Sequence, residues 1–436
     1  MFRPSDLKPS ASRRALGRNL ALDLVAATGL GVTLALVGAL LPTIARRGGL
    51  EPIGLSALAA APFIANLLGA FAGRYGPRSP RQLALARGIG AASLLLLFVL
   101  PVPAAMIGVA MVFWMSLAFG SPFHLRLWSV MYPARLVGRM VGFIGMARAG
   151  AGALAAFGGG LLADRLGGPP AVAVAGIVGI ACALAYAGLR ANTTERPPMF
   201  SARDSFRALR ERPVLARVTL AQGFYGGGLV AASPLYALVY VDRLDLSLAD
   251  VGVIGILASA STTVAFLIWG AVADRSGPLV VLRVGAAIGL VGLLAYAVAS
   301  SVVVLWLGAI AFGIASASID VGIASAVTAY APLQTRAAAS AGLNSVTGAR
   351  GIVMAFLMGA LLELGIVDVT SGLLVCAAIT AVGVVLYVRT VAVAASGGWA
   401  QDPGFAPASE WAGAPGSVPG EASRTVPAAA RVRVPG

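Results

Sequence analysis

Arg148 and Arg350 each interrupt a long apolar run of the sequence, and they lie 202 residues apart (350 minus 148). At a helical rise of 1.5 Å per residue, each lies about 15–20 Å deep in a membrane helix, near the bilayer midplane. A planar guanidinium can hold a carboxylate or a phosphate through two parallel hydrogen bonds. The pair therefore predicts a site for an anionic solute. The alternative is that each arginine pairs with an Asp or a carbonyl, or only locks two helices together.

Two carboxylates also lie inside apolar runs, where an ionisable group is costly unless it meets water or a partner. Asp320, deep in the run 302–330, is expected to be the protonatable partner of the arginines. Asp23 is only a few residues into the run 20–41. It is a second candidate for the proton pathway, with a role as a helix-interface residue as the alternative.

The run 104–131 carries His124 and Arg126 beyond a proline, Pro122. If the helix continues through Pro122, both side chains face a cavity and can relay protons, because histidine titrates near neutral pH. If the helix ends at Pro122, they are ordinary loop charges. The sequence leaves these two interpretations equally open.

Tyr225 precedes three consecutive glycines, Gly226 to Gly228, in the run 214–241. Each glycine weakens a helix by about 1 kcal/mol relative to alanine. The pattern is consistent with a bend beside the substrate that Tyr225 lines. Close packing of helices is the alternative explanation.

A nine-residue stretch at 69–77 recurs at 270–278, 201 residues later (270 minus 69), with six identical positions. Each copy closes an apolar run, and small residues there favour close helix packing in lipid. An arginine at such a helix end is stabilised by the helix dipole, and Asp274 can hold that end against a neighbouring helix. We predict a gating role, with topological anchoring as the alternative. The candidate gating residues are Gly69, Arg74, Gly76, Gly270, Asp274, Arg275 and Gly277.

Composition indicates a polytopic membrane protein. Apolar residues make up 58% of the 436 residues, charged residues only 11%, and the mean hydropathy is +0.89, whereas soluble domains carry roughly 25% charged residues. The net charge of +15 is spread over loops, as expected for a membrane protein, so no nucleic-acid partner is expected.

The predicted parts are a cytoplasmic N-terminus (1–19), a six-helix bundle (20–189), a cytoplasmic linker (190–213), a second six-helix bundle (214–390) and a disordered cytoplasmic tail (391–436).

Orientation follows from lysine and arginine, which concentrate in cytoplasmic loops. Alternate loops, beginning with the N-terminus, hold 26 of these residues, whereas the other set holds 4. Both termini and the linker are therefore predicted to be cytoplasmic, in the inner membrane of a cell. Within the linker, Phe206 and Leu209, with Phe200, can line one side of a short helix on the anionic membrane surface. A solvated basic linker is the alternative.

No pattern in the chain points to catalysis or to a metal. His124 is the only histidine, and Cys182 and Cys376 both fall in apolar runs, where they are read as core residues. No phosphate-binding Gly-x-x-x-x-Gly-Lys-Ser/Thr motif is present, so ATP is not expected to drive the protein. We therefore expect no enzyme activity, no metal and no cofactor.

Over residues 20–390 the sequence resembles the major facilitator superfamily. The resemblance rests on the stretch 270–277, the basic break between the sixth and seventh runs, and the segment from Tyr132 to Gly142. It implies twelve helices in two pseudo-symmetric bundles that rock around a central cavity. The first stretch departs from the family pattern, because Gly73 stands where an acidic residue is usual. Two motifs of proton-linked drug exporters are missing: Ser116 stands in place of an arginine, and a Gly-Pro-x-x-Gly-Gly run is absent.

The predicted fold is thus all-α, and the predicted function is secondary active transport of a small solute by a monomer in the lipid bilayer. Proton-coupled export of an amphiphilic compound is the first expectation, based on the resemblance. Uptake or exchange of a small organic anion held by Arg148 and Arg350 is the second. The third is a non-transporting membrane sensor or assembly partner.

Overall fold

The computed structural model describes residues 13–68, 76–132, 137–191, 202–332 and 335–395, and these are helical with no strand among them. The first half contains α1 (Arg13–Ala35), η2 (Leu36–Leu40), α2 (Leu41–Arg47), α3 (Pro52–Leu68), α5 (Pro80–Ser93), η4 (Leu94–Phe98), α6 (Pro103–Met131), α7 (Val137–Leu166) and α8 (Gly168–Ala187). After the short helix α9 (Ala202–Arg210), the second half contains α10 (Pro213–Leu238), η5 (Val239–Arg243), α11 (Leu248–Ser276), α12 (Pro278–Ala297), α13 (Val302–Tyr330), α14 (Arg336–Glu363) and α15 (Val369–Ala395).

The predicted all-α membrane fold is confirmed. Within the described ranges, eleven helical runs are long and apolar enough to cross a membrane, and α3 is a shorter apolar helix. Counted with α3, and with α1, η2 and α2 as one run, they give six helices in each half. The π-helical turns η2 and η5 lie in the first helical run of each half. The two halves therefore repeat a structural detail as well as a sequence stretch.

Proline and glycine set several helix ends. α3, α5, α6, α10 and α12 all begin at a proline, which has no N–H to leave unpaired in the first turn. Gly167 and Gly277 separate consecutive helices with φ of +92° and +81°, values that side chains other than glycine rarely adopt. Both glycines end the same pattern, Gly-x-x-Ala-Asp-Arg-x-Gly, at 160–167 and 270–277. The structure thus explains the final glycine of each copy by backbone conformation.

Some helices are longer than the sequence indicated. α1 begins at Arg13, within the expected N-terminal tail, because Leu16 is buried and Asn19 hydrogen-bonds to the backbone of Arg190. α15 continues to Ala395, so the expectation of disorder from residue 391 is wrong for the first turn of that segment. Residues 396–436 lie outside the described part. The structure also decides the question of Pro122, because α6 continues through it to Met131.

The linker contains a helix, as proposed, but its apolar side faces protein. Leu209 is buried, and a Cβ at Gly342 of α14 would lie 2.8 Å from one of its methyl groups. Phe206 is 50% exposed, and Phe200 lies outside the described residues. Helix α9 is therefore attached to α14 through Leu209, and only Phe206 and its charged neighbours remain available to other surfaces.

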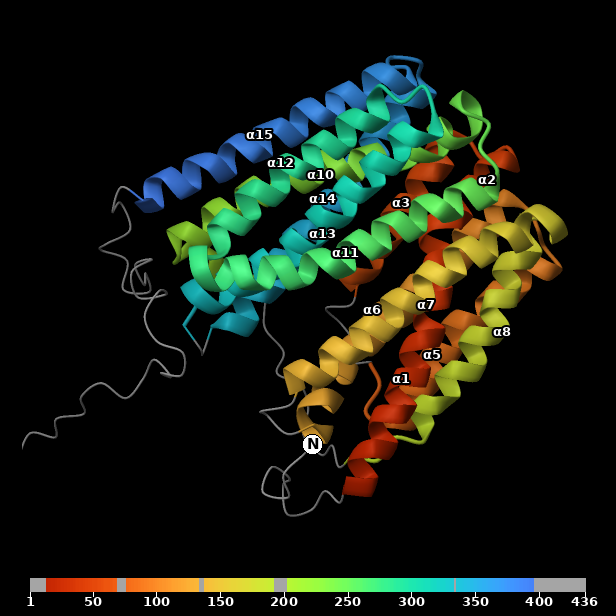
Figure 1. Cartoon of the computed structure of the whole chain (residues 1–436), viewed down its shortest axis with the longest axis horizontal. Coiled ribbons are helices and arrows are strands. Elements are labelled where there is room, and N and C mark those ends of the chain that lie inside the picture. Colours follow the sequence, from red (N-terminus) through yellow and green to blue (C-terminus); the bar gives the residue numbers. More distant parts are fainter. Residues whose placement is uncertain (1–12, 69–75, 133–136, 192–201, 333–334, 396–436) are drawn as a thin grey trace, which may run out of the picture.

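The two halves form separate bundles that converge at one end, beside α2, and diverge at the other (Figure 1). We call the first the hairpin end, which comprises the connections at 48–51, 99–102, 244–247, 298–301 and 364–368. We call the second the linker end, which includes α9, Gly76 and Gly277. The halves touch mainly through α7 against α11 and α3 against α14. Glycines allow this contact, because they have no side chain to keep the backbones apart. A Cβ at Gly252 of α11 would lie 2.8 Å from the Cα of Phe157 on α7, which is too close for any other residue.

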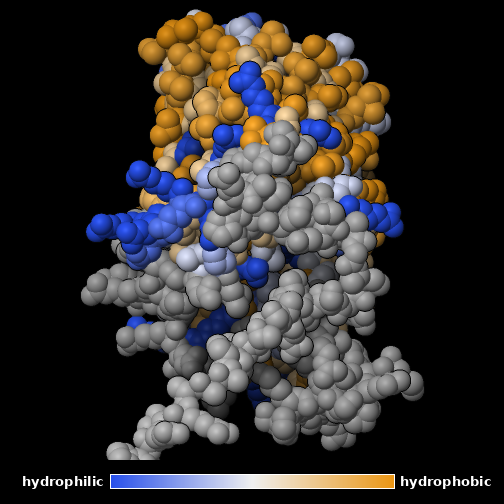
Figure 2. Space-filling view, turned by 90° about the vertical axis from the view of Figure 1, so that its left-hand side faces the viewer, coloured by the Kyte–Doolittle hydropathy of each residue, from blue (hydrophilic) through white to orange (hydrophobic). Residues whose placement is uncertain are grey.

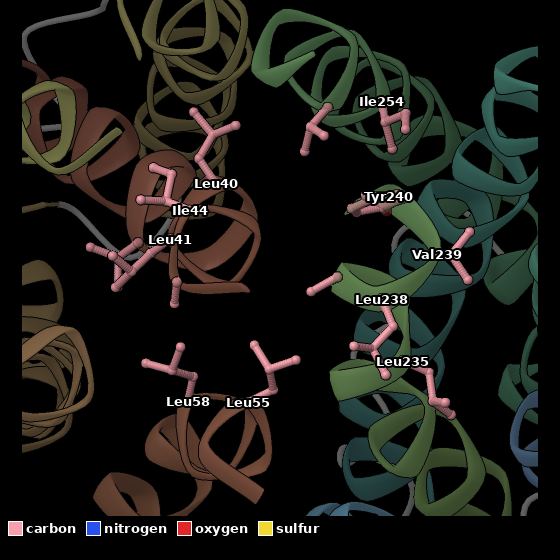
Figure 3. Packing of buried hydrophobic residues seen from close by; sticks show 14 of the residues in the cluster. Leu40, Leu41, Ile44, Leu55, Leu58, Leu235, Leu238, Val239, Tyr240 and Ile254 are labelled. Carbon is pink, nitrogen blue, oxygen red and sulfur yellow. The ribbon is translucent and has the colours of Figure 1, made fainter. Parts of the chain in front are cut away.

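A shared hydrophobic core seals the hairpin end. Figure 3 shows side chains of η2, α2 and α3 on one side and those of α10, η5 and α11 on the other. All belong to one cluster of buried residues that includes both halves. The labelled members are Leu40, Leu41, Ile44, Leu55, Leu58, Leu235, Leu238, Val239, Tyr240 and Ile254.

Polar contacts reinforce this seal. Asp164, at the end of α7, accepts hydrogen bonds from the backbone N–H groups of Leu248 and Ala249 at 3.0 and 2.9 Å, and so caps the start of α11 in the other half. Its carboxylate is also 3.8 Å from Arg47. Arg46 forms an ion pair of 2.9 Å with Asp242. A carboxylate at a helix N-terminus is favoured by the helix dipole, so Asp164 holds the halves together at the hairpin end.

The opposite end lacks this seal among the described residues. Asp274 and Arg275, which occupy the same pattern positions as Asp164 and Arg165, are exposed. Gly69 and Arg74 lie outside the described part. Seen from the side on which α15 ends, hydrophobic residues cover the upper bundle and hydrophilic residues gather below them (Figure 2).

We predict that Asp164→Ala shifts the protein toward a state that is open at the hairpin end. The change removes the two hydrogen bonds from α7 to the first turn of α11 and leaves that helix its own N-cap, Ser247. The lost contact is worth about 1 to 2 kcal/mol. Spin labels at Leu100 and Val298, one in each half at this end, should report a longer distance in a larger fraction of molecules. Asp368→Asn is the matched control, because Asp368 binds Ser371 within its own half. An unchanged distance distribution in Asp164→Ala would contradict the latch.

Candidate functional site

Each half contains a cavity, and charged side chains lie in both. Cavity A, of about 490 Å³, is lined by α1, α5, α6, α7 and α8, with Asn66 of α3. Cavity B, of about 340 Å³, is lined by α10, α13 and α14. Arg148 lines cavity A, and it acts electrostatically on Asp320, which lines cavity B. Charged groups of the two cavities are therefore within electrostatic range of each other across the space between the halves.

Arg148 has the exposed position that the sequence suggested for a substrate contact. It lies in the middle of α7 and its side chain is exposed to cavity A. Helix α1 crosses the backbone at this residue so closely that Gly31 has no room for a Cβ beside the Arg148 carbonyl. The packing of α1 on α7 thus fixes the backbone of Arg148 and leaves its guanidinium in the cavity.

Arg350 is held more tightly. One of its terminal nitrogens donates a hydrogen bond to the carbonyl oxygen of Gln222 on α10. The guanidinium packs against Gly226, where an added Cβ would lie only 2.7 to 2.8 Å from its atoms. Its Nε has no hydrogen-bond partner, and the residue lines cavity B. Arg350 therefore braces α14 against α10 and also lies in the wall of cavity B.

The three glycines of α10 pack against other helices. Gly226 makes room for Arg350, and Gly228 lies against the backbone of Cys376 on α15. The helix is continuous from Pro213 to Leu238. Tyr225 is part of the lining of cavity B and is only 1% exposed, and its contact with a substrate stays a prediction.

Asp23 is the centre of a buried hydrogen-bond network. It is fully buried and accepts from Trp128 Nε1 at 2.7 Å and from the Tyr132 hydroxyl at 3.1 Å, and it contacts His124 Nε2 at 3.1 Å. His124 also stacks against Trp128 and meets the edge of Tyr186. The structure thus links the two residues that the sequence treated separately, and it places His124 between Asp23 and cavity A.

Arg126 does not share this arrangement. It lies on α6 near His124 but is not part of the lining of cavity A. The continuation of α6 beyond Pro122 therefore brings His124, and not Arg126, to the cavity.

Sequence reasoning missed Arg87, which was counted among the loop cations. It lies on α5 and lines cavity A, yet it is only 7% exposed. Its Nη2 donates to Ser121 at 3.4 Å, and it lies within electrostatic range of Arg148 and Tyr186. The signal was present in the sequence, because Arg87 follows Leu83 and Ala84 within the expected third span.

The described residues offer no metal site, since no three His, Cys, Asp or Glu side chains among them converge. Cys182 and Cys376 are free thiols in the two halves. The chemistry available in the cavities is therefore that of guanidinium, carboxylate, imidazole and hydroxyl groups, which can bind a solute and exchange protons.

Comparison with known proteins agrees with this architecture. Residues 218–419 match the model of the Major Facilitator Superfamily. No curated protein sequence matches the chain. Among solved structures, the nucleoside transporter NupG has a TM-score of 0.68 at 14% identity, over 86% of this chain and 99% of that one.

Two further structures have the same fold at similarly low identity. The human organic anion transporter MFSD10 (TETRAN) has a TM-score of 0.58 at 16% identity, over 85% of this chain and 99% of that one. A bacterial homologue of the human lysosomal transporter Spinster has a TM-score of 0.58 at 15% identity, over 88% and 96%. The second half thus matches the family model, and both halves share the fold of these transporters.

Proposed function

We propose that the protein is a secondary active transporter that moves a small organic anion across the cell membrane by alternating access. The observation that carries the proposal is the placement of Arg148 and Arg350. They lie on the fifth helix of each half, α7 and α14, and each lines the cavity of its own half. A solute between the halves can be bound by both guanidiniums, which suit carboxylate or phosphate.

The closed hairpin end and the position of cavity A favour an inward-open state. Trp128 and Val141 line cavity A and lie within about one turn of the linker-end limits of α6 and α7. The arginine-rich loops suggest that this end is cytoplasmic. The cavities would then load from, or release to, the cytoplasm.

Asp320 is the proposed proton site. It is exposed to cavity B, and Arg148 is the charged side chain that acts on it from the other half. Asp23 is fully buried and already bound by three groups, so it is less suited to exchange protons with a solute. Protonation of Asp320 would release Arg148 from a competing carboxylate and favour binding of an anion. Proton and anion would therefore bind together and move together.

Export of an amphiphilic compound is the second candidate. Trp114, Leu117 and Trp128 in the wall of cavity A would suit an apolar body. The structural relatives are divided, because one is named as a nucleoside transporter and another as an organic anion transporter. The arginines favour the anion. A non-transporting sensor would depend on the tail, which lies outside the described residues.

The double substitution Arg148→Ala/Arg350→Ala should abolish stabilisation by anions. In a thermal-unfolding screen with anionic, neutral and cationic solutes, an anion at 100 times its dissociation constant should stabilise the wild type by about 2.7 kcal/mol. Arg165→Ala and Arg389→Ala, which remove exposed arginines outside both cavities, should keep the response. Shifts caused only by cationic or apolar solutes, and retained in the double variant, would instead support the amphiphile exporter.

Asp320→Asn should separate proton movement from solute movement. In proteoliposomes, the anion with the largest thermal shift should drive proton uptake through the wild type, and this proton flux should disappear in Asp320→Asn while anion exchange persists. Asp23→Asn should instead lower thermal stability, because it disrupts a buried network by about 1 to 3 kcal/mol. Proton flux that persists in Asp320→Asn would refute this assignment.

Asp274 is proposed to form the mirror-image latch. Asp164 caps α11 in this state, and Asp274 occupies the same pattern position at the opposite end of the α7–α11 pair. In the alternative state it would cap the start of α7. Asp274→Ala should therefore shorten the mean distance between the labels at Leu100 and Val298, opposite to Asp164→Ala. A shift in the same direction would contradict the mirrored roles.

A further inference from the structure

Arg87 is the most deeply buried cation in the wall of cavity A, and the fold does not satisfy it. Only 7% of its surface is exposed, and its Nε and Nη1 have no hydrogen-bond partner among the described residues. The hydrogen bond that it donates to Ser121 is long, at 3.4 Å. A buried charge without compensation destabilises a fold. The free energy needed to bury the Arg87 charge is thus not offset by its contacts with the described residues.

The surrounding helices are shaped to hold this guanidinium. Gly120 on α6 lies against it, and a Cβ there would be 3.2 Å from Nε and 3.3 Å from Cζ. Tyr186 on α8 provides a second unsatisfied group, because its hydroxyl is buried without a partner and the residue is only 1% exposed. Both Arg87 and Tyr186 line cavity A. Two unpaired donors from different helices therefore converge on one wall of the cavity.

The buried carboxylate of this half, Asp23, is already bound by other groups. Asp23 is held by His124, Trp128 and Tyr132. The other cation in the lining of cavity A, Arg148, adds positive potential near Arg87. A buried guanidinium with unpaired Nε–H and Nη1–H groups can donate charge-assisted hydrogen bonds to an oxyanion, and a phenol can add another.

We propose that Arg87 and Tyr186 form a subsite that binds the acidic group of a ring-containing organic anion. The ring would pack on Trp114 and Trp128, whose side chains line the same cavity. The proposal rests on the anion transport proposed above, and it specifies which residues bind the acidic group. A carboxylate and a phosphate monoester share this chemistry, and the experiment distinguishes them.

The subsite predicts an unusual combination of effects for Arg87→Met, which removes the charge and keeps the length of the side chain. The ligand-free protein should unfold at a higher temperature, because an uncompensated buried charge is gone. Its affinity for an anionic ligand should fall by about tenfold to a hundredfold, the range expected for charge-assisted hydrogen bonds. A brace that only joins α5 to α6 would give the opposite change in stability.

The test is thermal unfolding of the full chain in detergent with benzoate, phenyl phosphate or the neutral analogue benzamide. At least one of the two anions should stabilise the wild type, while benzamide should not. Arg87→Met should lose this response, Arg87→Lys should keep part of it, and Tyr186→Phe should weaken it while retaining the ring that packs on His124. Arg81→Met is the matched control, since Arg81 is exposed on the same helix and lies outside the cavity.

Three results would overturn the subsite. If Arg87→Met lowers the unfolding temperature and still responds to the anion, Arg87 is a structural brace. If the response disappears only in Arg148→Ala or Arg350→Ala, the anion is transported without the subsite. If neither benzoate nor phenyl phosphate stabilises the wild type, both the subsite and the anion transport proposal fail. A larger shift with phenyl phosphate than with benzoate would assign the subsite to phosphate monoesters, and the reverse to carboxylates.

Discussion

An ionisable group inside an apolar helix bundle must be paired or must meet water, and the arrangement of this protein depends on that constraint. Asp23 meets it through three protein groups, and Arg350 meets it in part through the carbonyl of Gln222. Arg148 and Asp320 meet it by facing the cavities. Arg87 is not paired in this way by the part of the chain that the structure describes. The degree to which each charge is satisfied therefore separates structural groups from groups that remain available to a solute.

Small residues line the contact between the two halves. The halves touch along two helix pairs, α7 with α11 and α3 with α14. Glycines such as Gly252 and Gly348 let these backbones approach without interlocking side chains. The hairpin-end contacts through Asp164 and Arg46 are few and partly exposed, so each stabilises one state only modestly. Two states close in energy are what a carrier needs in order to alternate.

Much of the fold was predictable because its signals are local. Apolar length, prolines at helix starts and the repeated stretch indicated two six-helix halves. The sequence did not decide whether the fourth helix ends at Pro122. A proline removes one backbone hydrogen-bond donor, but in a membrane protein neighbouring helices can satisfy the carbonyl that loses its partner. The first two turns of α1 and the last turn of α15 were missed because these turns depend on packing, such as the burial of Leu16, and not on a local sequence signal.

By itself, the sequence determined the helical class, the two-half repeat and the charged residues that lie in apolar runs, because hydropathy and spacing depend on the chain alone. Tertiary structure decided which of those charges are free. Only packing against Trp128 and Tyr132 shows that Asp23 is satisfied, and only the position of α6 beside α5 shows that Arg87 is buried without a full set of partners. Hydrogen-bond satisfaction depends on groups that are distant in sequence, 34 residues away for Arg87 and more than a hundred for Asp23, and no local pattern encodes which of them meet.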